Sequence, residues 1–339
     1  MTMTSRELVR RAIHFQKPER TPRHVWALPW ATERYPEYFA RLRREFPDDI
    51  VTVPPLYLAP LPIVGGRYEK GDYIDEWGCH FRNIHGGVIG ITHKALIEDW
   101  SQLEGFRTPE SALAIDAEAV RAFCRSTGQF TLAGTLIRPL ERLQFIRNME
   151  QALMDLAEEP PELLELLRRI HAHYVREVEA WARTDVDAIV IMDDWGAQQR
   201  MLVSPKVFRR HFKPMYEEYV AVARRYGKYV FMHSDGNILD IMEDLVAIGI
   251  DALNSQVAVM GVEELGKRFA GRMTFWGEID RQVLLSRGTK EEVAQAVRDV
   301  RTHLYADGGV IAECEFGPGS RPENVLHVFE TWRRIDEGA

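Results

Sequence analysis

The residues of this sequence that are best suited to chemistry come directly after short apolar runs in the second half of the chain. Five of these runs end in side chains that can exchange protons, bind cations or form hydrogen bonds. The five endings are Asp193-Asp194-Trp195, His233-Ser234-Asp235, Asn254-Ser255-Gln256, Glu278-Ile279-Asp280 and Glu313-Cys314-Glu315. Helix caps explain one or two endings of this kind, so five in succession favour an active site at the ends of the strands.

One subset of these endings has the ligand types of a metal site. The nitrogen of His233, the carboxylate of Asp235 and the thiolate of Cys314 are all groups that zinc accepts. Three protein ligands leave one coordination position open, as in catalytic zinc sites, and Glu278 is a candidate for a fourth ligand or for a partner of a ligand. Because the spacing of these residues is no metal motif by itself, a hydrogen-bonded histidine and a buried thiol are the competing interpretation.

The adjacent carboxylates Asp193 and Asp194 are candidates for proton transfer or for holding a cationic group. Two carboxylates near one site raise the pKa of at least one of them, which suits a general base. We therefore predict catalytic roles for Asp193, Asp194 and Glu278. The alternative for the two aspartates is a helix cap and a salt-bridge partner.

A further set of polar and aromatic residues is predicted to contact the substrate. Asn254, Gln256 and Asp280 belong to it because they follow apolar runs. Trp30 belongs to it because it lies in an aromatic stretch, residues 26–39, that could form a wall over the site. The alternative for this stretch is packing against the N-terminal helix.

The elements that must position these residues alternate regularly from about residue 128. Apolar runs of strand length occur at 129–134, 187–192, 228–232, 250–253, 273–276 and 309–312, with helical patterns between them. Strands that are short and continuously apolar are typical of a parallel sheet covered by helices. With earlier candidates at 24–28 and 50–53 there are about eight strands, which favours a (β/α)8 TIM barrel over a doubly wound sheet. An amphipathic helix at 5–14 precedes the barrel, and residues 67–88 are predicted to form a β-hairpin insertion.

Composition narrows the functional classes. The 339 residues carry a formal net charge of −8, so we expect no binding to nucleic acid and no attraction to an anionic membrane. No stretch approaches the roughly 18 apolar residues that cross a bilayer, and the N-terminus lacks a signal-peptide pattern. Three cysteines are too few for a disulfide framework, which predicts a cytoplasmic protein. We expect residues 1–339 to form a single domain.

Long ordered segments give the sequence a family resemblance. They are TSRELVRRAIHFQKPERTP, DEWGCHFRN, IMDDWGAQQRMLVSPKVFRRHFKPMY, FMHSDGNILDIMEDLVAIGIDALNSQ, FWGEIDRQVLLSRGTKEEV and GPGSRPENV. Through them the chain resembles the uroporphyrinogen decarboxylase superfamily, in particular its methylcobamide:coenzyme M methyltransferase-like branch. The resemblance implies a (β/α)8 barrel, and family barrels often pair as homodimers.

The resemblance implies two alternative activities. Methyltransferases of the superfamily hold zinc through a His-x-Cys motif and a distant cysteine, to which His233, Asp235 and Cys314 correspond, with Asp235 in place of a thiolate. This match implies a zinc-dependent methyltransferase that works with a corrinoid partner protein on a small methylated or thiol substrate. The carboxylate makes the site harder, which weakens the implied thiol methylation and leaves open another substrate, such as an aryl methyl ether or a methylamine-type compound. The alternative is cofactor-free uroporphyrinogen decarboxylation, in which Asp193 or Asp194 contacts pyrrole NH groups. The segment HVWALPWATERY, however, lacks the RQAGRY motif that binds substrate carboxylates in those enzymes. A non-catalytic binding protein is a third hypothesis.

Overall fold

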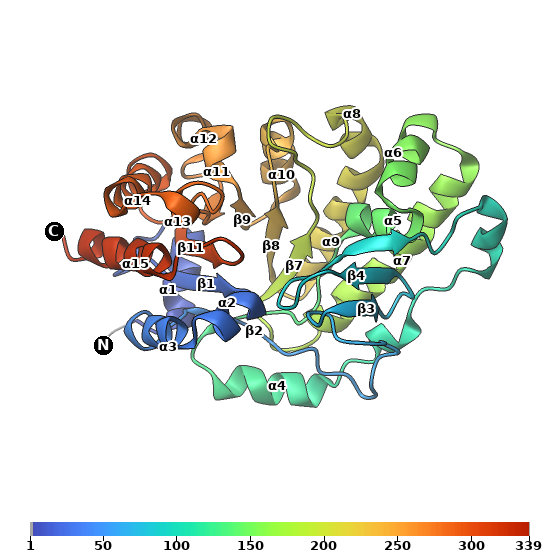
Figure 1. Cartoon of the computed structure of the whole chain (residues 1–339), viewed down its shortest axis with the longest axis horizontal. Coiled ribbons are helices and arrows are strands. Elements are labelled where there is room, and N and C mark those ends of the chain that lie inside the picture. The colour runs from blue at the N-terminus through green and yellow to red at the C-terminus, as the bar shows by residue number, and fades with distance from the viewer. Residues whose placement is uncertain (1–2, 339) are drawn as a thin grey trace.

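An eight-stranded parallel sheet forms the centre of the computed structural model, which describes residues 3–338 (Figure 1). The strand order is β1-β11-β10-β9-β8-β7-β6-β2. The strands are β1 (Arg23–Ala27), β2 (Ile50–Thr52), β6 (Phe130–Leu132), β7 (Ala188–Met192), β8 (Tyr229–Ser234), β9 (Ala252–Ser255), β10 (Thr274–Trp276) and β11 (Val310–Phe316). The backbone N–H of Asp49 donates to the carbonyl of Arg23 at 2.8 Å. This bond joins the two outer strands, so the sheet is a nearly closed barrel and the predicted (β/α)8 fold is confirmed.

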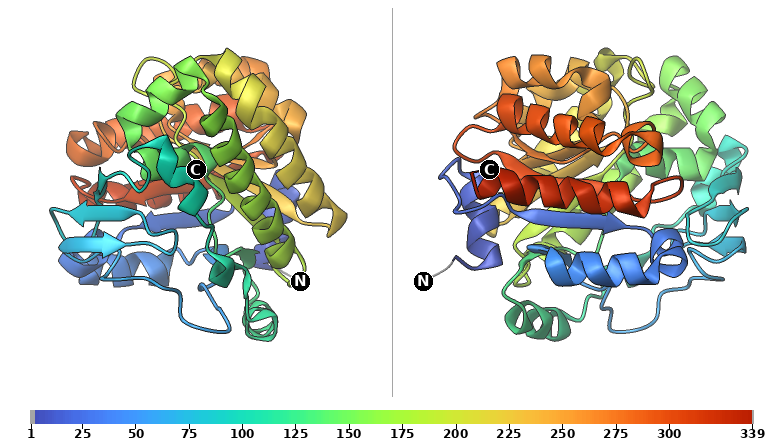
Figure 2. Two further views of the ribbon diagram at one scale, coloured as in Figure 1. Left: turned by 90° about the vertical axis from the view of Figure 1, so that its right-hand side faces the viewer. Right: turned by 60° about the vertical axis from the view of Figure 1, so that its left-hand side comes forward.

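Helices surround the barrel and connect its strands (Figures 1 and 2). The long ones are α1 (Ser5–Ile13), α3 (Pro36–Glu45), α4 (Ala117–Ser126), α5 (Pro139–Arg147), α6 (Met149–Glu158), α7 (Pro161–Ala182), α9 (Lys213–Arg225), α12 (Val262–Phe269), α14 (Lys290–Leu304) and α15 (Pro322–Asp336). The shorter ones are α2 (Pro29–Arg34), α8 (Pro205–Val207), α10 (Met242–Ile248), α11 (Val257–Met260), α13 (Leu284–Arg287), the 3₁₀ helices at Trp100–Gly105, Glu110–Leu113 and Leu239–Ile241, and a π-helical turn at Phe208–Phe212. Among residues 3–338 we find no helix with the length and apolar character needed to cross a membrane.

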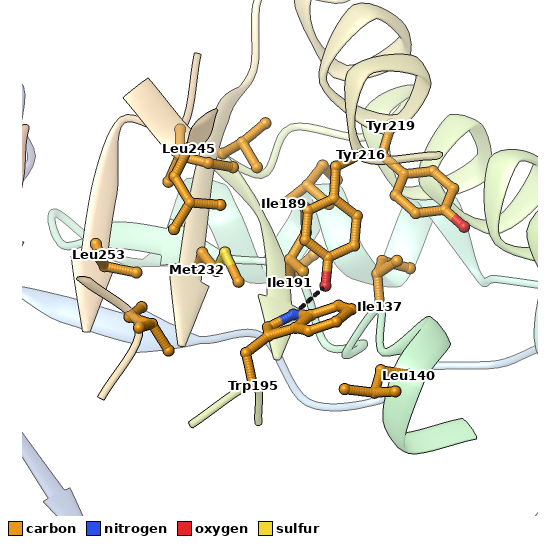
Figure 3. Close-up of a cluster of buried hydrophobic side chains, with 14 of the residues drawn as sticks. Ile137, Leu140, Ile189, Ile191, Trp195, Tyr216, Tyr219, Met232, Leu245 and Leu253 are labelled. Atoms are coloured by element: carbon orange, nitrogen blue, oxygen red, sulfur yellow. Dashed lines mark hydrogen bonds between the residues drawn. The ribbon is translucent and has the colours of Figure 1, made fainter. Parts of the chain in front are cut away.

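The main apolar layer lies between the outer face of the sheet and the helices (Figure 3). Ile189, Ile191 and Met232 point outward from β7 and β8 and pack beneath Tyr216 of α9. The indole N–H of Trp195 donates to the Tyr216 hydroxyl at 3.0 Å, and that hydroxyl donates to Asp193 at 2.6 Å. The layer therefore fixes the loop that follows β7.

The interior of the barrel is apolar toward the N-terminal ends of its strands. Phe130, Val190 and Phe231 fill it, and Val9 and Ile13 of α1 close it from below. Strand side chains alternate between the two faces of the sheet, so the polar residues further along the same strands also face inward. The polar side chains of these strands therefore gather at the C-terminal mouth of the barrel.

The predicted hairpin insertion is a three-stranded antiparallel sheet. Its strands are β3 (Gly71–Ile74), β4 (His80–Asn83) and β5 (Ile91–Lys94), in the order β3-β4-β5. The rings of Phe81 and Phe145 meet at 5.0 Å, and the buried Arg142 of α5 pairs with Asp75. The predicted hairpin, residues 67–88, is short by one strand because β5 lies beyond it at Ile91–Lys94.

Three barrel strands extend further than the sequence predicts. β8 continues to Ser234, β9 to Ser255 and β11 to Phe316. Residues that were expected to follow the strands therefore lie within them, where neighbouring side chains point to opposite faces. The greater length of these strands decides which of the predicted site residues point toward the same face and lie close together.

Candidate metal centre at the barrel mouth

Asp194, His233 and Asp235 converge at the C-terminal ends of β7 and β8. Each offers one ligand atom, and these three atoms lie within 4.8 Å of one another. The Nε2 atom of His233 is 3.4 Å from Asp194 Oδ1 and 3.7 Å from Asp235 Oδ1. Within residues 3–338 this is the group of His, Cys, Asp and Glu side chains that could hold a metal ion.

Two glycines bring the carboxylates together. The backbone at Gly196, after β7, lies directly against the backbone at Gly236, after β8. A Cβ atom at Gly236 would lie 2.2 Å from the carbonyl carbon of Gly196, and Gly236 has a φ of +77°. The N–H of Asp235 also donates to Asp194 Oδ1 at 3.0 Å. Only residues without a Cβ allow this approach.

The imidazole of His233 is oriented by Asn254 of β9. His233 Nδ1 is 2.6 Å from Asn254 Oδ1, while the Asn254 amide donates to the carbonyl of Trp276 and to Glu313 at 2.6 and 2.9 Å. Because the amide oxygen is the acceptor, Nδ1 carries the proton and Nε2 faces the carboxylates. Metal-binding histidines are usually held in this way by a partner on the other ring nitrogen.

His233 and Asp194 each shift the pKa of the other. Burial lowers the pKa of His233, but the hydrogen bond and charge of Asp194 and the charge of Asp235 outweigh it and raise the pKa to about 9. Burial likewise raises the pKa of Asp194, but His233 outweighs it and lowers that pKa to about 2. The carboxylates thus attract a cation to Nε2, whether a proton or a metal ion.

A second group of carboxylates surrounds Arg281 and shares Asp235 with the first group. The guanidinium pairs with Asp235, with Glu315 at 2.7 Å and with Glu278 at 3.4 Å. Glu278 is only 4% exposed, and neither of its oxygens has a hydrogen-bond partner in the described residues. Burial, opposed by Arg281 and assisted by the charges of Asp235 and Glu315, raises the pKa of Glu278 to about 7.

Aromatic side chains also lie at the mouth, beside His233. Trp26 of β1 lies edge-on to His233, with ring centroids 4.9 Å apart, and parallel to Trp276 at 6.0 Å. The Trp276 indole donates to His24 Nδ1 at 3.1 Å, and burial lowers the pKa of His24 to about 3. His24 and Trp26 occupy alternate positions on a strand with one face toward the barrel interior, which is the signal in the sequence that could have identified them.

The remaining predicted residues have mainly positioning roles. Asp193 is fully buried and accepts hydrogen bonds from the backbone N–H groups of Leu140 and Glu141, so it holds the start of α5. Gln256 donates to Asp235 at 3.2 Å. Asp280 accepts from two backbone N–H groups of the turn that follows Arg281.

Trp30 lies outside this hydrogen-bonded network. Its ring packs against Tyr35 at 5.9 Å, and its backbone N–H donates to Gly87 of the insertion at 3.1 Å. We find no described hydrogen bond, ion pair or ring contact that joins Trp30 to the metal-site residues. Trp30 therefore packs within the aromatic stretch and against the insertion, and its contact with substrate stays a prediction, whereas Trp26 contacts His233.

The structure does not bring Cys314 to the metal site. In the register of β1 and β11, Cys314 pairs with Val25 and Glu315 pairs with Trp26. Cys314 and Val25 both belong to the apolar layer outside the barrel, where Cys314 is 0% exposed. Because β11 includes residues 313–315, Glu313 and Glu315 face the mouth while the thiol between them faces away. Asp194 takes the third position in the ligand group instead.

Two surface hollows lie elsewhere. One, of about 400 Å³, is lined by α6 and the segment around α8, and the other, of about 470 Å³, by α7 and the segment around residues 104–108. Neither is lined by residues of the barrel mouth, and neither gathers candidate metal ligands.

Comparisons with known proteins agree with the fold. A methyltransferase from Methanosarcina mazei superposes with a TM-score of 0.73 at 14% identity, covering 98% of this chain and 99% of that chain. A zinc-bound IOLI protein covers 68% of this chain and 84% of that chain at 12% identity, and a GH113 β-1,4-mannanase covers 92% and 98% at 12% identity. Their TM-scores of 0.39 and 0.41 are too low to support an argument. No curated protein sequence gives a significant match.

The family is established by sequence. The profile of uroporphyrinogen decarboxylase (URO-D) matches residues 74–335, which is most of the chain and includes six of the eight barrel strands, all except β1 and β2. The similarity to the methyltransferase adds the same fold over nearly the whole chain. The chain therefore belongs to the uroporphyrinogen decarboxylase family.

Proposed function

We propose that this protein is a metal-dependent methyltransferase whose metal is held by Asp194, His233 and Asp235. The observation that carries the proposal is the convergence of three ligand atoms within 4.8 Å at the mouth of the barrel. Active sites of (β/α)8 enzymes lie at this end of the strands. Family membership and the fold shared with a methyltransferase support the reaction class.

The donor set fits a divalent metal ion. One imidazole nitrogen and two carboxylate oxygens are accepted by zinc and leave a coordination position open. Two carboxylates in place of thiolates make the site harder than a cysteine-rich zinc site. When bound, the metal would act as a Lewis acid on an oxygen, nitrogen or sulfur atom of the substrate.

The chain's own residues perform the remaining tasks. Asn254 fixes the tautomer and direction of His233 through the bond to Nδ1. Gln256 and Arg281 each hold one oxygen of Asp235, so this carboxylate is presented in one orientation. With a pKa of about 7, Glu278 is suited to accept or return a proton at a substrate heteroatom. A corrinoid carried by a separate protein would serve as the methyl carrier.

The charge of the mouth argues against decarboxylation of a tetrapyrrole with many carboxylates. Such a substrate needs several free cations, but the guanidinium of Arg281 is already paired with three carboxylates. Arg138, the other described arginine beside Asp194, pairs with Glu141 at 3.4 Å. A polyanion would therefore meet net repulsion in this mouth.

Metal content tests the proposal directly. Protein purified without chelators should contain close to one divalent metal ion per chain by elemental analysis, and His233→Ala or Asp194→Asn should remove most of it. His211→Ala is a matched control, because His211 also pairs with a carboxylate, Glu159, at 2.9 Å, but outside the mouth. Metal-dependent loss of the methyl–cobalt absorbance of methylcobalamin, in the presence of small acceptors, measures the reaction. Wild-type protein without metal after supply of zinc, manganese or iron would refute the proposal.

A further inference from the structure

We propose that the carboxylates of Glu278, Glu313 and Glu315 form a subsite for a positively charged amine or ammonium group of the substrate. We call these three residues the acidic wall. The inference deepens the proposed function and rests on it for the bound molecule being a substrate. The binding of a cation by these residues can be measured independently of any reaction.

The acidic wall contains buried oxygen atoms without partners. Glu278 is 4% exposed and Glu313 is 1% exposed. Both oxygens of Glu278 and the Oε1 atom of Glu313 have no hydrogen-bond partner among the described residues. Burying a polar atom without a partner costs free energy, and most buried polar atoms in folded proteins are paired. Two such side chains facing one mouth indicate that a ligand supplies the missing donors.

The local charge balance calls for a cation. Arg281 Nη1 lies 2.7 Å from Glu315 and 3.4 Å from Glu278, while Nη2 pairs with Asp235. One guanidinium is therefore shared by three carboxylates. Glu313 adds a fourth carboxyl group, and burial together with the charges of Glu278 and Glu315 raises its pKa well above the usual value, so a cation bound beside it would favour its ionised form. A metal ion at Asp194 and Asp235 would offset the charges of those two carboxylates and leave the negative charge of the acidic wall in excess. A ligand with one positive charge restores the balance.

Aromatic faces lie next to the acidic wall. Trp26 is the register partner of Glu315 between β1 and β11, so the two side chains leave the same face of the sheet. The indole of Trp26 also contacts the ring of His233. The faces of tryptophan rings attract cations, and quaternary ammonium groups in particular are bound by aromatic side chains. Carboxylates and an indole together are suited to an alkylammonium group close to the metal ligands.

The spacing of the acidic wall favours an organic cation over a second metal ion. Metal ligation needs donor atoms in a compact group, and within residues 3–338 only Asp194, His233 and Asp235 meet that criterion. The acidic wall is thus too spread out for a metal ion. It matches the larger radius and diffuse charge of an amine that carries methyl groups.

Choline provides a probe, because its neutral isostere 3,3-dimethylbutan-1-ol has the same shape without the charge. Calorimetric titration of metal-loaded wild-type protein should show at least tenfold tighter binding of choline than of the alcohol. Glu278→Gln and Trp26→Leu should each weaken choline binding at least tenfold. If Glu278→Gln does not give the circular dichroism spectrum of the wild type, Glu315→Gln serves as the test, since Glu315 is less buried.

Asp194→Asn separates this inference from the proposed function. It should remove metal while choline still binds at least as tightly as it does to the metal-loaded wild type. Choline bound by a wild-type protein that holds no metal would support the acidic wall and refute the metal-dependent function. Equal binding of choline and the alcohol by the wild type, or unchanged binding in the folded Glu278→Gln and Trp26→Leu variants, would overturn the inference.

Discussion

Replacing Asn254 with alanine should weaken metal binding without abolishing it. Asn254 is 2% exposed and touches none of the proposed carboxylate ligands, but its side chain forms three short hydrogen bonds. One of them holds Nδ1 of His233, so its loss frees the imidazole to rotate or to exchange its tautomer. Partners of this kind typically contribute 10- to 100-fold to metal affinity, and we expect a decrease of about that size.

The same substitution should also destabilise the fold. Each lost hydrogen bond contributes about 0.5–1.5 kcal/mol, so three of them predict a loss of about 2–4 kcal/mol in the free energy of unfolding. Asn324→Ala is the matched control for this effect. Asn324 is 3% exposed and donates to the carbonyls of Leu284 and Gly288 at 3.0 and 2.9 Å, far along the chain from the ligands.

The assay combines chelator competition, which measures metal affinity, with urea unfolding of the metal-free proteins. Asn254→Ala should lower both quantities, whereas Asn324→Ala should lower only the free energy of unfolding. Equal metal affinity in the two variants would show that general destabilisation, and not the orientation of His233, determines metal binding. If Asn254→Ala binds metal with the affinity of the wild type, then Asn254 does not orient His233 for metal binding through Nε2.

Three further predictions concern single positions. Gly236→Ala should lower the free energy of unfolding in urea by about 2–4 kcal/mol, because it combines a positive φ with a backbone clash. The control is Gly227→Ala, for which the loss should be only about 1 kcal/mol, because Gly227 has a φ of +69° but open space around it. Cys314→Ser should lower stability by about 1–3 kcal/mol, because it buries a hydroxyl in the apolar layer, and elemental analysis should find its metal content unchanged. Since burial lowers the pKa of His24 from its usual 6.5 to about 3, neutral His24 stabilises the fold above pH 6.5, and this contribution is lost as the pH falls toward 3. Between pH 7 and pH 5 the wild type should therefore lose about 1–2 kcal/mol more than His24→Gln in urea unfolding.

The fold was predictable from the sequence because its signals are local. Apolar runs without alternation mark strands covered on both faces, and each is followed by a helical pattern, as in β8 and α10. Thr289 and Glu292 form the capping box that their spacing predicts at the start of α14. The metal-site residues His233 and Asp235 were likewise recognisable because they end an apolar run.

The parts of the site that could not be predicted depend on strand register and on backbone approach. Where a strand extends by a few residues, side chains that were expected on a loop alternate between the two faces of the sheet instead, and for this reason the prediction placed Cys314 in the mouth. Asp194 joins the ligand group because Gly196 and Gly236 let two loops touch, a contact between segments 40 residues apart in the sequence. Arg281 carries no motif of its own, and its role appears only once the ends of β8, β10 and β11 are assembled around it.

Arg281 also makes the two halves of the mouth dependent on each other. It pairs with the ligand Asp235 through one nitrogen and with Glu315 and Glu278 of the acidic wall through the other. A cation that binds at the acidic wall competes with the guanidinium for Glu278 and Glu315. It therefore strengthens the pairing of Arg281 with Asp235, and a metal at Asp235 in turn weakens that pairing and leaves the guanidinium to the acidic wall. Such linkage is reciprocal. If metal lowers choline affinity by some factor, choline must lower metal affinity by the same factor. Neutralising Arg281 should therefore reduce both effects together.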